Sequence, residues 1–202
     1  MKTAAITGGT GFIGGALARE LLSRGGYRVR ILTRSLPASR LEGAEYAVIS
    51  FSDPGSLSRA LEGADFVVHL AARLFSRNRA GFERANAKGT ADLVRAAASL
   101  PKRPEKFVYL SSLAAGGPSP SPAAPREESM REAPVSFYGS TKLGGEAALR
   151  DLASGMRFTI LRPPIVYGKN ESGVSKIAHW VRKGFMVNAG ASDGAFSFIY
   201  VE

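Results

Sequence analysis

The stretch Thr7-Gly8-Gly9-Thr10-Gly11-Phe12-Ile13-Gly14 decides the fold because of the segments on either side of it. A short apolar run, residues 2–6, precedes it and predicts a buried β-strand, and residues 12–22 follow it with apolar side chains at helical spacing. A glycine-rich turn between strand and helix lets the backbone approach a pyrophosphate, and the helix dipole adds to the attraction. The stretch therefore predicts a dinucleotide site, with a tight turn that binds nothing as the alternative.

Predicted strands and helices alternate along the rest of the chain. The further strands are expected at residues 28–33, 46–51, 65–70, 107–110, 158–161 and 196–201, and the further helices at 54–61, 83–99 and 136–153. Asp53 is expected to cap the helix that starts with Pro54, and residues 116–134, rich in Pro, Ser and Ala, predict an exposed loop. Alternation of this kind predicts the α/β class, with a doubly wound parallel sheet of Rossmann type.

Composition limits the classes of function. A chain of 202 residues can bury one substantial core, and the absence of cysteine excludes disulfides, thiolate metal sites and a cysteine nucleophile. No run reaches the length of a membrane span and the chain enters its first strand at once, so we expect a cytoplasmic protein with no membrane partner. His69 and His179 have no partner at metal-ligand spacing, so no metal is expected, and His69 is interpreted as a core residue with satisfied hydrogen bonds.

The charge balance is basic, with 27 Lys and Arg against 17 Asp and Glu, a formal net charge of +10. A basic balance favours anionic partners, and nucleic acid is one candidate. The positive residues are scattered, however, and no basic run is interleaved with aromatic residues. We therefore prefer a solvated basic surface with one phosphate-binding cleft, and expect no nucleic-acid partner.

Two polar pairs could carry chemistry. Tyr138 and Lys142 are four residues apart on a predicted helix, so both side chains project from one face. A neighbouring ammonium would lower the pKa of a tyrosine towards the range of a useful general base. Ser111 and Ser112 follow the strand 107–110, at the sheet edge where parallel sheets place ligands, and a hydroxyl there could hold a substrate oxygen.

Arg34 lies just past the second predicted strand, where dinucleotide-binding folds read the adenosine ribose. An acidic residue there would bind the 2′-hydroxyl of NAD, whereas an arginine suits the 2′-phosphate of NADP. We therefore favour NADP, with NAD as the alternative.

These residues together resemble the extended short-chain dehydrogenase/reductase superfamily, in particular its NAD-dependent epimerase/dehydratase family. The motifs that carry the resemblance are TGGTGFIG from Thr7, His69-Leu70-Ala71-Ala72, Asn86 with Gly89-Thr90, Tyr109-Leu110-Ser111-Ser112, Tyr138-Gly139-Ser140-Thr141-Lys142, Leu161-Arg162-Pro163-Pro164-Ile165-Val166-Tyr167-Gly168, and Phe198-Ile199-Tyr200-Val201.

The resemblance implies roles for particular residues. Ser112, Tyr138 and Lys142 would form the catalytic triad, and Ser111 would assist. The residues that it implies around the cofactor, together with Arg34, are Gly8, Gly11, Phe12, Ile13, Gly14, Ser50, Phe51, Leu70, Ala71, Ala72, Asn86, Ser111, Tyr138, Lys142, Pro163 and Ile165.

The family relation also implies an organisation. Residues 1–168 would form the NAD(P)-binding Rossmann domain, and residues 169–202 the start of a small substrate-binding lobe. Relatives run on for about another hundred residues, so the chain is expected to be truncated at its C-terminus and its lobe incomplete. Small residues on the two long helices allow close packing, either in the domain core or between subunits, and the resemblance implies a homodimer through a four-helix bundle built from these helices.

Departures from the family pattern narrow the activity. Leu113-Ala114 follow Ser112 where sugar-nucleotide dehydratases place Asp-Glu, and Ser50 stands where many relatives carry an aspartate. Sugar-nucleotide epimerases usually show an asparagine where Ile165 stands, and this apolar replacement resembles the dihydroflavonol-reductase-like and hydroxysteroid-dehydrogenase-like members instead. The first hypothesis is an NAD(P)-dependent oxidoreductase acting on a carbinol or ketone carbon of a small molecule. The alternatives are a sugar-nucleotide epimerase with tightly bound NAD, and a non-catalytic regulatory or RNA-binding member.

Overall fold

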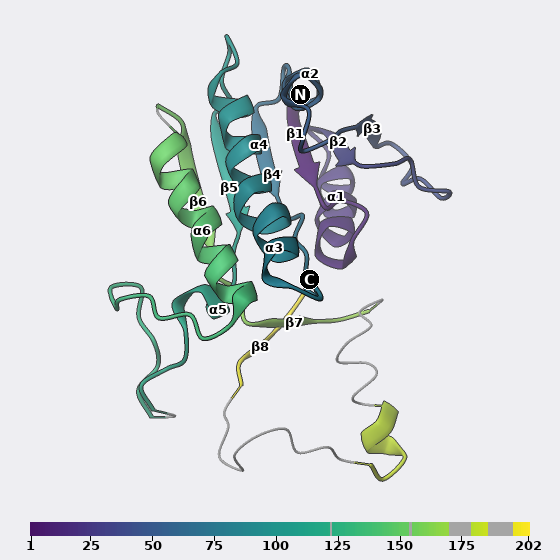
Figure 1. The fold of residues 1–202 in the computed structure, drawn as a ribbon. Coiled ribbons are helices and arrows are strands. Elements are labelled where there is room, and N and C mark those ends of the chain that lie inside the picture. Colours follow the sequence, from purple (N-terminus) through teal and green to yellow (C-terminus); the bar gives the residue numbers. More distant parts are fainter. Residues whose placement is uncertain (122, 154, 170–178, 186–195) are drawn as a thin grey trace.

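A computed structural model describes residues 1–121, 123–153, 155–169, 179–185 and 196–202. Its centre is a six-stranded sheet in the order β3-β2-β1-β4-β5-β6, in which every neighbouring pair is parallel (Figure 1). The strands are β1 (Lys2–Thr7), β2 (Tyr27–Thr33), β3 (Glu45–Val48), β4 (Phe66–His69), β5 (Lys106–Leu110) and β6 (Arg157–Leu161). The predicted doubly wound Rossmann-type sheet is therefore confirmed.

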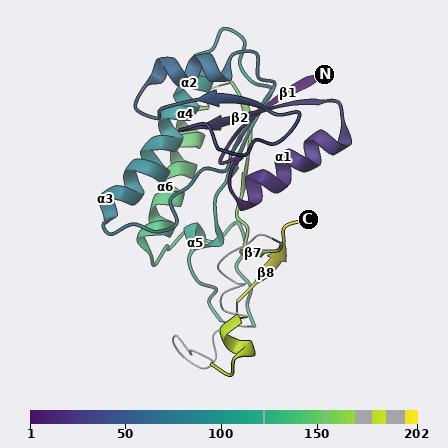
Figure 2. The same cartoon turned by 90° about the vertical axis from the view of Figure 1, so that its right-hand side faces the viewer.

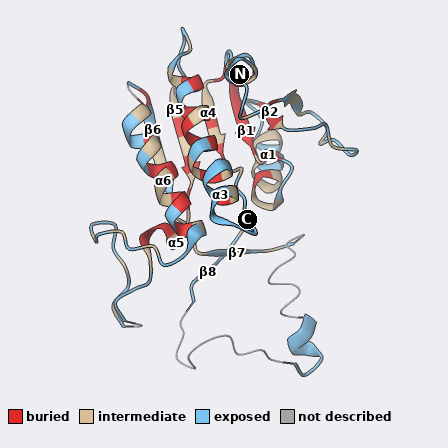
Figure 3. Cartoon of the chain, viewed as in Figure 1, coloured by how far each residue is buried: buried red, intermediate tan, exposed pale blue. Residues whose placement is uncertain are grey.

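Helices cover both faces of this sheet, as the edge-on view in Figure 2 shows. The helix α1 (Phe12–Arg24) lies on one face, and α2 (Pro54–Leu61), α4 (Gly89–Ala98) and α6 (Phe137–Leu152) lie on the other. Each face has its own apolar core, the larger one on the side of α2, α4 and α6. Buried residues gather in the strands and on the helix sides that face them (Figure 3).

The strand order creates a switch point between β1 and β4. The chain runs outward from β1 through β2 to β3 and then crosses to β4, on the opposite side of β1. Open α/β sheets bind ligands outside the carboxyl ends of the strands at such a point. The glycine-rich turn after β1 and the end of β4 therefore meet where a ligand is expected.

Local signals explain several element boundaries. Asp53 caps α2 by accepting a hydrogen bond from the Gly55 N–H at 3.0 Å, with Pro54 at the first helical position, as predicted. The strand expected at residues 46–51 is shorter, because β3 ends at Val48 and a turn carries Phe51 against the core.

The helix expected at residues 83–99 begins earlier and is not regular. Its first turn is α3 (Arg79–Phe82), capped by Asn78, whose side chain accepts from the Gly81 N–H at 2.9 Å. A π-helical segment, η1 (Glu83–Lys88), follows and leads into α4. The sequence pattern missed the early start because a cap residue outside the apolar repeat sets it. π-helical turns inside α-helices often occur at functional sites.

Two short elements lie at the carboxyl edge. The helix α5 (Leu113–Gly116) follows β5 directly and takes the first residue of the expected 116–134 loop. The strands β7 (Ile165–Tyr167) and β8 (Phe198–Tyr200) form a separate parallel pair. The sequence predicted a strand at 196–201 but not β7. Among the described residues, no helix has the length and apolar content needed to cross a membrane.

Candidate active site

The glycine-rich turn lies directly against the end of β4. Gly8 has a φ of 72°, which glycine adopts without strain. A Cβ on Gly8 would lie 2.8 Å from the Ala71 backbone nitrogen and 2.9 Å from the Leu70 carbonyl carbon. No side chain larger than hydrogen fits between these two backbones, so the turn and the β4 end form one continuous backbone surface.

The helix α1 begins immediately above this turn with open N–H groups. Gly11 is its N-cap residue and offers no side-chain cap, and Phe12 and Ile13 form the first helical positions. A Cβ on Gly14 would overlap the Gly8 carbonyl oxygen, so glycine is required for the helix to lie this close to the turn. N–H groups left without a capping side chain at a helix start attract an anion.

The segment after β4 is held from two sides. The Ala71 N–H donates to the Thr7 hydroxyl at 3.2 Å, and Ala72 is exposed. The Asn86 side chain pairs with the Arg73 backbone, accepting from its N–H at 2.8 Å and donating to its carbonyl at 3.1 Å. The buried Asn86 amide also donates to Thr141 on α6 at 3.2 Å. The Asn86 amide therefore makes its hydrogen bonds within the protein, and the predicted contact between Asn86 and the cofactor stays a prediction.

His69 is a core residue with both ring nitrogens satisfied, as predicted. Nδ1 lies 2.6 Å from the Thr7 hydroxyl and Nε2 lies 2.9 Å from the Thr90 hydroxyl. Burial lowers the pKa of His69 to about 3, and the positive Lys142 contributes in the same direction. The ring is therefore neutral at physiological pH.

Ser112 and Tyr138 meet at the carboxyl edge of the sheet. Ser112 is the N-cap of α5, its hydroxyl accepting from the Ala114 N–H at 3.2 Å, and Tyr138 lies in the first turn of α6. The two side chains hydrogen-bond to each other, and the Phe82 ring lies edge-on to Tyr138 at 6.4 Å. Burial raises the pKa of Tyr138, while the hydrogen bond with Ser112 acts in the opposite direction.

Lys142 is buried one turn after Tyr138 on α6. Its Nζ donates to the Leu110 carbonyl at 2.7 Å and lies 4.2 Å from the centroid of the Tyr109 ring. Burial lowers the pKa of Lys142 to about 7, and Glu146 opposes that change. The sequence predicted that Lys142 would lower the pKa of Tyr138. That role stays a prediction: in the structure the ammonium faces Leu110 and Tyr109, and burial raises the pKa of Tyr138.

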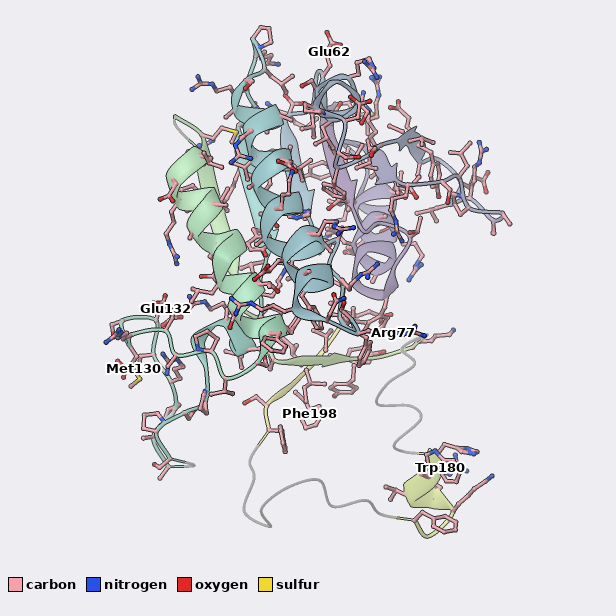
Figure 4. The ribbon with its side chains drawn as sticks, viewed as in Figure 1. Glu62, Arg77, Met130, Glu132, Trp180 and Phe198 are labelled. Carbon is pink, nitrogen blue, oxygen red and sulfur yellow. The ribbon has the colours of Figure 1, made fainter. Side chains whose placement is uncertain are left out.

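Ser111 faces a buried ion pair. Its hydroxyl donates to the Glu146 carboxylate at 2.5 Å, and Glu146 is fully buried. Arg162 binds the same carboxylate through two nitrogens, at 2.8 and 2.6 Å, and reaches Glu132 at 2.8 Å (Glu132 is labelled in Figure 4). The pKa of Glu146 is lowered, because hydrogen bonds from Arg162 and Ser111 outweigh its burial.

Sequence reasoning missed this ion pair. The available signal was Glu146 four residues after Lys142, on the helix face that is otherwise small and apolar. Because the Ser111 hydroxyl is engaged by Glu146, its predicted assistance at the site stays a prediction.

The remaining predicted cofactor residues lie along the same edge. Arg34 is exposed one residue after β2, and no partner of its side chain is found among the described residues. Ser50 is exposed, with its hydroxyl 2.8 Å from that of Ser52, and the Phe51 ring lies 6.1 Å from His69.

On the far side of the site, the carbonyl of Pro163 accepts from the Leu113 N–H at 3.1 Å, and Ile165 is exposed in β7. Within the described ranges, no cluster of three or more His, Asp or Glu could hold a metal.

Comparison with known proteins places these features in context. The model of the NAD dependent epimerase/dehydratase family matches residues 4–201. A ceramide reductase of Caulobacter vibrioides is 33% identical over 83% of this chain and 47% of its own length. A dTDP-6-deoxy-L-talose 4-dehydrogenase (NAD(P)(+)) of Kitasatospora kifunensis is 35% identical over 85% of this chain and 54% of its own. The chain spans about half the length of these curated relatives.

The fold is also matched among solved structures. A putative epimerase from Burkholderia cenocepacia has a TM-score of 0.84 and 27% identity, covering 99% of this chain and 67% of its own.

Proposed function

The chain belongs to the NAD dependent epimerase/dehydratase family, and on that premise we propose that it is an NAD(P)-dependent oxidoreductase. Its substrate would be a small molecule with a carbinol or ketone carbon. The single observation that carries this proposal is the Ser112–Tyr138 hydrogen bond, which lies at the same sheet edge as the glycine-rich turn. A binding module would need the turn but not this half-buried pair of hydroxyls.

The residues present fit a dinucleotide cofactor. The pyrophosphate would be held by the open N–H groups at the start of α1, around Gly11, Phe12 and Ile13. Gly8 and Gly14 leave the space that the backbone approach needs. When bound, the nicotinamide would supply or accept a hydride. Leu70, Ala71 and Ala72 would lie under the cofactor, and Pro163 and Ile165 would back its ring.

Within the site, Tyr138 would donate a proton to the substrate oxygen in reduction, or remove one in oxidation. Ser112 would hold that oxygen through its hydroxyl. Lys142 would stay close to the cofactor ribose and favour the phenolate of Tyr138 once its ammonium faces the site. Because burial alone raises the pKa of Tyr138, this help from charge is required for tyrosine to act as a base near neutral pH.

We favour NADP as the cofactor. Arg34 is exposed at the end of β2 and has no carboxylate partner among the described residues, so it is available for a 2′-phosphate. Calorimetric titration with NADPH and NADH tests this preference. Arg34→Ala should weaken NADPH binding about tenfold or more and leave NADH binding nearly unchanged.

A sugar-nucleotide epimerase is the second candidate. The putative epimerase that shares this fold favours it, and the basic charge would suit a nucleotide-sugar substrate. An epimerase would retain nicotinamide nucleotide through purification and show no net oxidation of added cofactor. Arg34 and Ile165 favour the oxidoreductase instead.

We also propose that the protein is a cytoplasmic homodimer. A groove between η1 and α6 has small residues along its lining, Ala80, Ala87, Ser140, Thr141 and Gly144, together with the charged residues Arg79, Glu83, Arg84 and Lys88. Small residues let two helices approach closely, so these faces could meet those of a second copy in a four-helix bundle. No nucleic-acid or membrane partner is proposed.

The decisive experiment follows NADPH oxidation with a panel of ketones. Tyr138→Phe should reduce turnover about 10²-fold or more, because it removes the proton donor, and should leave cofactor affinity within about twofold. Tyr27→Phe, at the opposite end of the sheet, is the matched control and should behave like the parent chain. Unchanged turnover in Tyr138→Phe would contradict the role of this residue.

A further inference from the structure

The buried ring of Tyr109 contacts both ionisable groups that lie behind the proposed catalytic pair. The His69 ring stacks on it with centroids 5.4 Å apart and an interplanar angle of 17°. The Lys142 Nζ lies 4.2 Å from the centroid of the same ring. His69 and Tyr109 are fully buried and Lys142 is 1% exposed, so water does not screen these contacts.

The orientation of this ring is fixed at its far end. The Tyr109 hydroxyl hydrogen-bonds with Thr90 on α4 and lies 3.5 Å from the Lys142 carbonyl. Gly145 on α6 leaves the room that the hydroxyl occupies, because a Cβ there would overlap the phenol oxygen. The ring therefore cannot turn away from Lys142 without breaking the contact between β5 and α6.

The Lys142 ammonium has little other support. Among the described residues, Lys142 donates one side-chain hydrogen bond, to the neutral carbonyl of Leu110. Glu146, the nearest carboxylate on its helix, is already bound by Ser111, Arg150 and Arg162. An aromatic face attracts a cation through its quadrupole, and the attraction is stronger when the cation is desolvated.

We propose that Tyr109 is a positioning residue whose ring keeps the buried Lys142 ammonium charged and in a fixed place, one turn of α6 after Tyr138. The importance of this contact for catalysis rests on the function proposed above, whereas the contact itself can be tested without turnover. Other titratable groups near Lys142 are His69 from β4 and, from its own helix, Tyr138 and Glu146. His69 is neutral above about pH 4, so it does not titrate in the range where Lys142 does.

The test measures the titration of Lys142 in the purified chain without added cofactor. Lysine labelled with ¹³C at Cε reports the charge by NMR, and the Lys142 signal is assigned by its loss in Lys142→Arg. Tyr109→Phe keeps the ring, so the midpoint near pH 7 should persist. Trifluorophenylalanine at position 109 keeps the shape and removes the quadrupole. It should lower the midpoint by about half a pH unit or more, because the charged form loses its attraction.

Phe107 provides the matched control. It is buried on the same strand, with its ring 6.4 Å from the His69 ring. Trifluorophenylalanine at position 107 should leave the Lys142 midpoint unchanged. Equal midpoints for phenylalanine and its fluorinated form at position 109 would overturn the proposal, as would an equal shift from position 107. If the midpoint moves as expected but no ketone is reduced, the proposed function fails and the ring–ammonium contact stands.

Discussion

At the scale of single residues, the buried His69 should make the unfolding free energy depend on pH. Its pKa is lowered from 6.5 to about 3, so between these values the unfolded chain binds a proton that the folded chain does not. The contribution of His69 to stability is therefore fully present above about pH 6.5 and is lost as the pH falls. The expected contribution is up to about 1.4 kcal/mol of unfolding free energy per pH unit.

Urea denaturation between pH 5.5 and 8 measures this dependence. His69→Gln should lower stability at pH 8, where a buried hydrogen-bonded ring is lost, and should flatten the slope below pH 6.5. The exposed His179 supplies the control, since His179→Gln should keep the parent slope. A steep slope retained in His69→Gln would assign the effect to another group.

A second prediction at this scale compares two neighbouring glycines of α1. Gly14→Ala places a Cβ against the Gly8 carbonyl, so it should destabilise the fold by about 1–3 kcal/mol and abolish tight cofactor binding. The nearest atom to a Cβ on Gly15 is the flexible end of Arg19, at 3.4 Å. Gly15→Ala should therefore stabilise the helix by up to about 1 kcal/mol. Thermal unfolding and calorimetry with NADPH distinguish the two variants.

At the scale of elements, the start of α6 positions Tyr138. The Ser136 hydroxyl accepts from the Gly139 N–H at 3.0 Å and so caps the helix two residues before Tyr138. Ser136→Ala should lower the unfolding free energy by about 1 kcal/mol and also reduce turnover. Ser136→Asp should restore most of both, because aspartate is a good cap. Full activity in the alanine variant would mean that tertiary packing alone fixes the first turn.

The ion pair between Arg162 and Glu146, with Glu132 beside it, joins three parts of the site. Arg162 follows β6, Glu146 lies on α6, and Glu132 belongs to the loop before that helix. Arg162→Met leaves the Glu146 carboxylate buried without its main partner, so it should cost about 3–5 kcal/mol in chemical denaturation. Glu132→Gln removes a partner that is 31% exposed, and should cost about 1 kcal/mol or less. Equal losses of unfolding free energy in the two variants would contradict the view that Glu146 is the main partner of Arg162.

At the scale of the whole molecule, the proposed dimer predicts that a bulky side chain in the groove separates the two copies. Ser140 is exposed and lines the groove between η1 and α6. Ser140→Arg should convert a dimer to a monomer in sedimentation velocity, because the long cation cannot fit where two small faces meet. Ser99 is exposed at the C-terminal end of α4, away from the groove, so Ser99→Arg is the control and should leave the dimer intact. A parent chain that sediments as a monomer would refute the bundle.

The sequence by itself determined the architecture and predicted that a ligand would bind at the carboxyl ends of the parallel strands. The glycine spacing from Gly8 to Gly14 and the alternation of apolar strands with amphipathic helices depend on local backbone preferences, which are readable in short windows. The satisfied state of His69 also followed, because a lone histidine in an apolar strand must find partners to be buried.

Only the tertiary structure decided what the polar side chains do. Arg162 lies 16 residues from Glu146 and 30 from Glu132, and Thr7 lies 62 residues from His69. No local pattern specifies such partners, because they meet through packing of elements distant in sequence. For the same reason, the pKa values of Tyr138 and Lys142 follow from burial and through-space neighbours, which the spacing of the two residues on one helix could not supply.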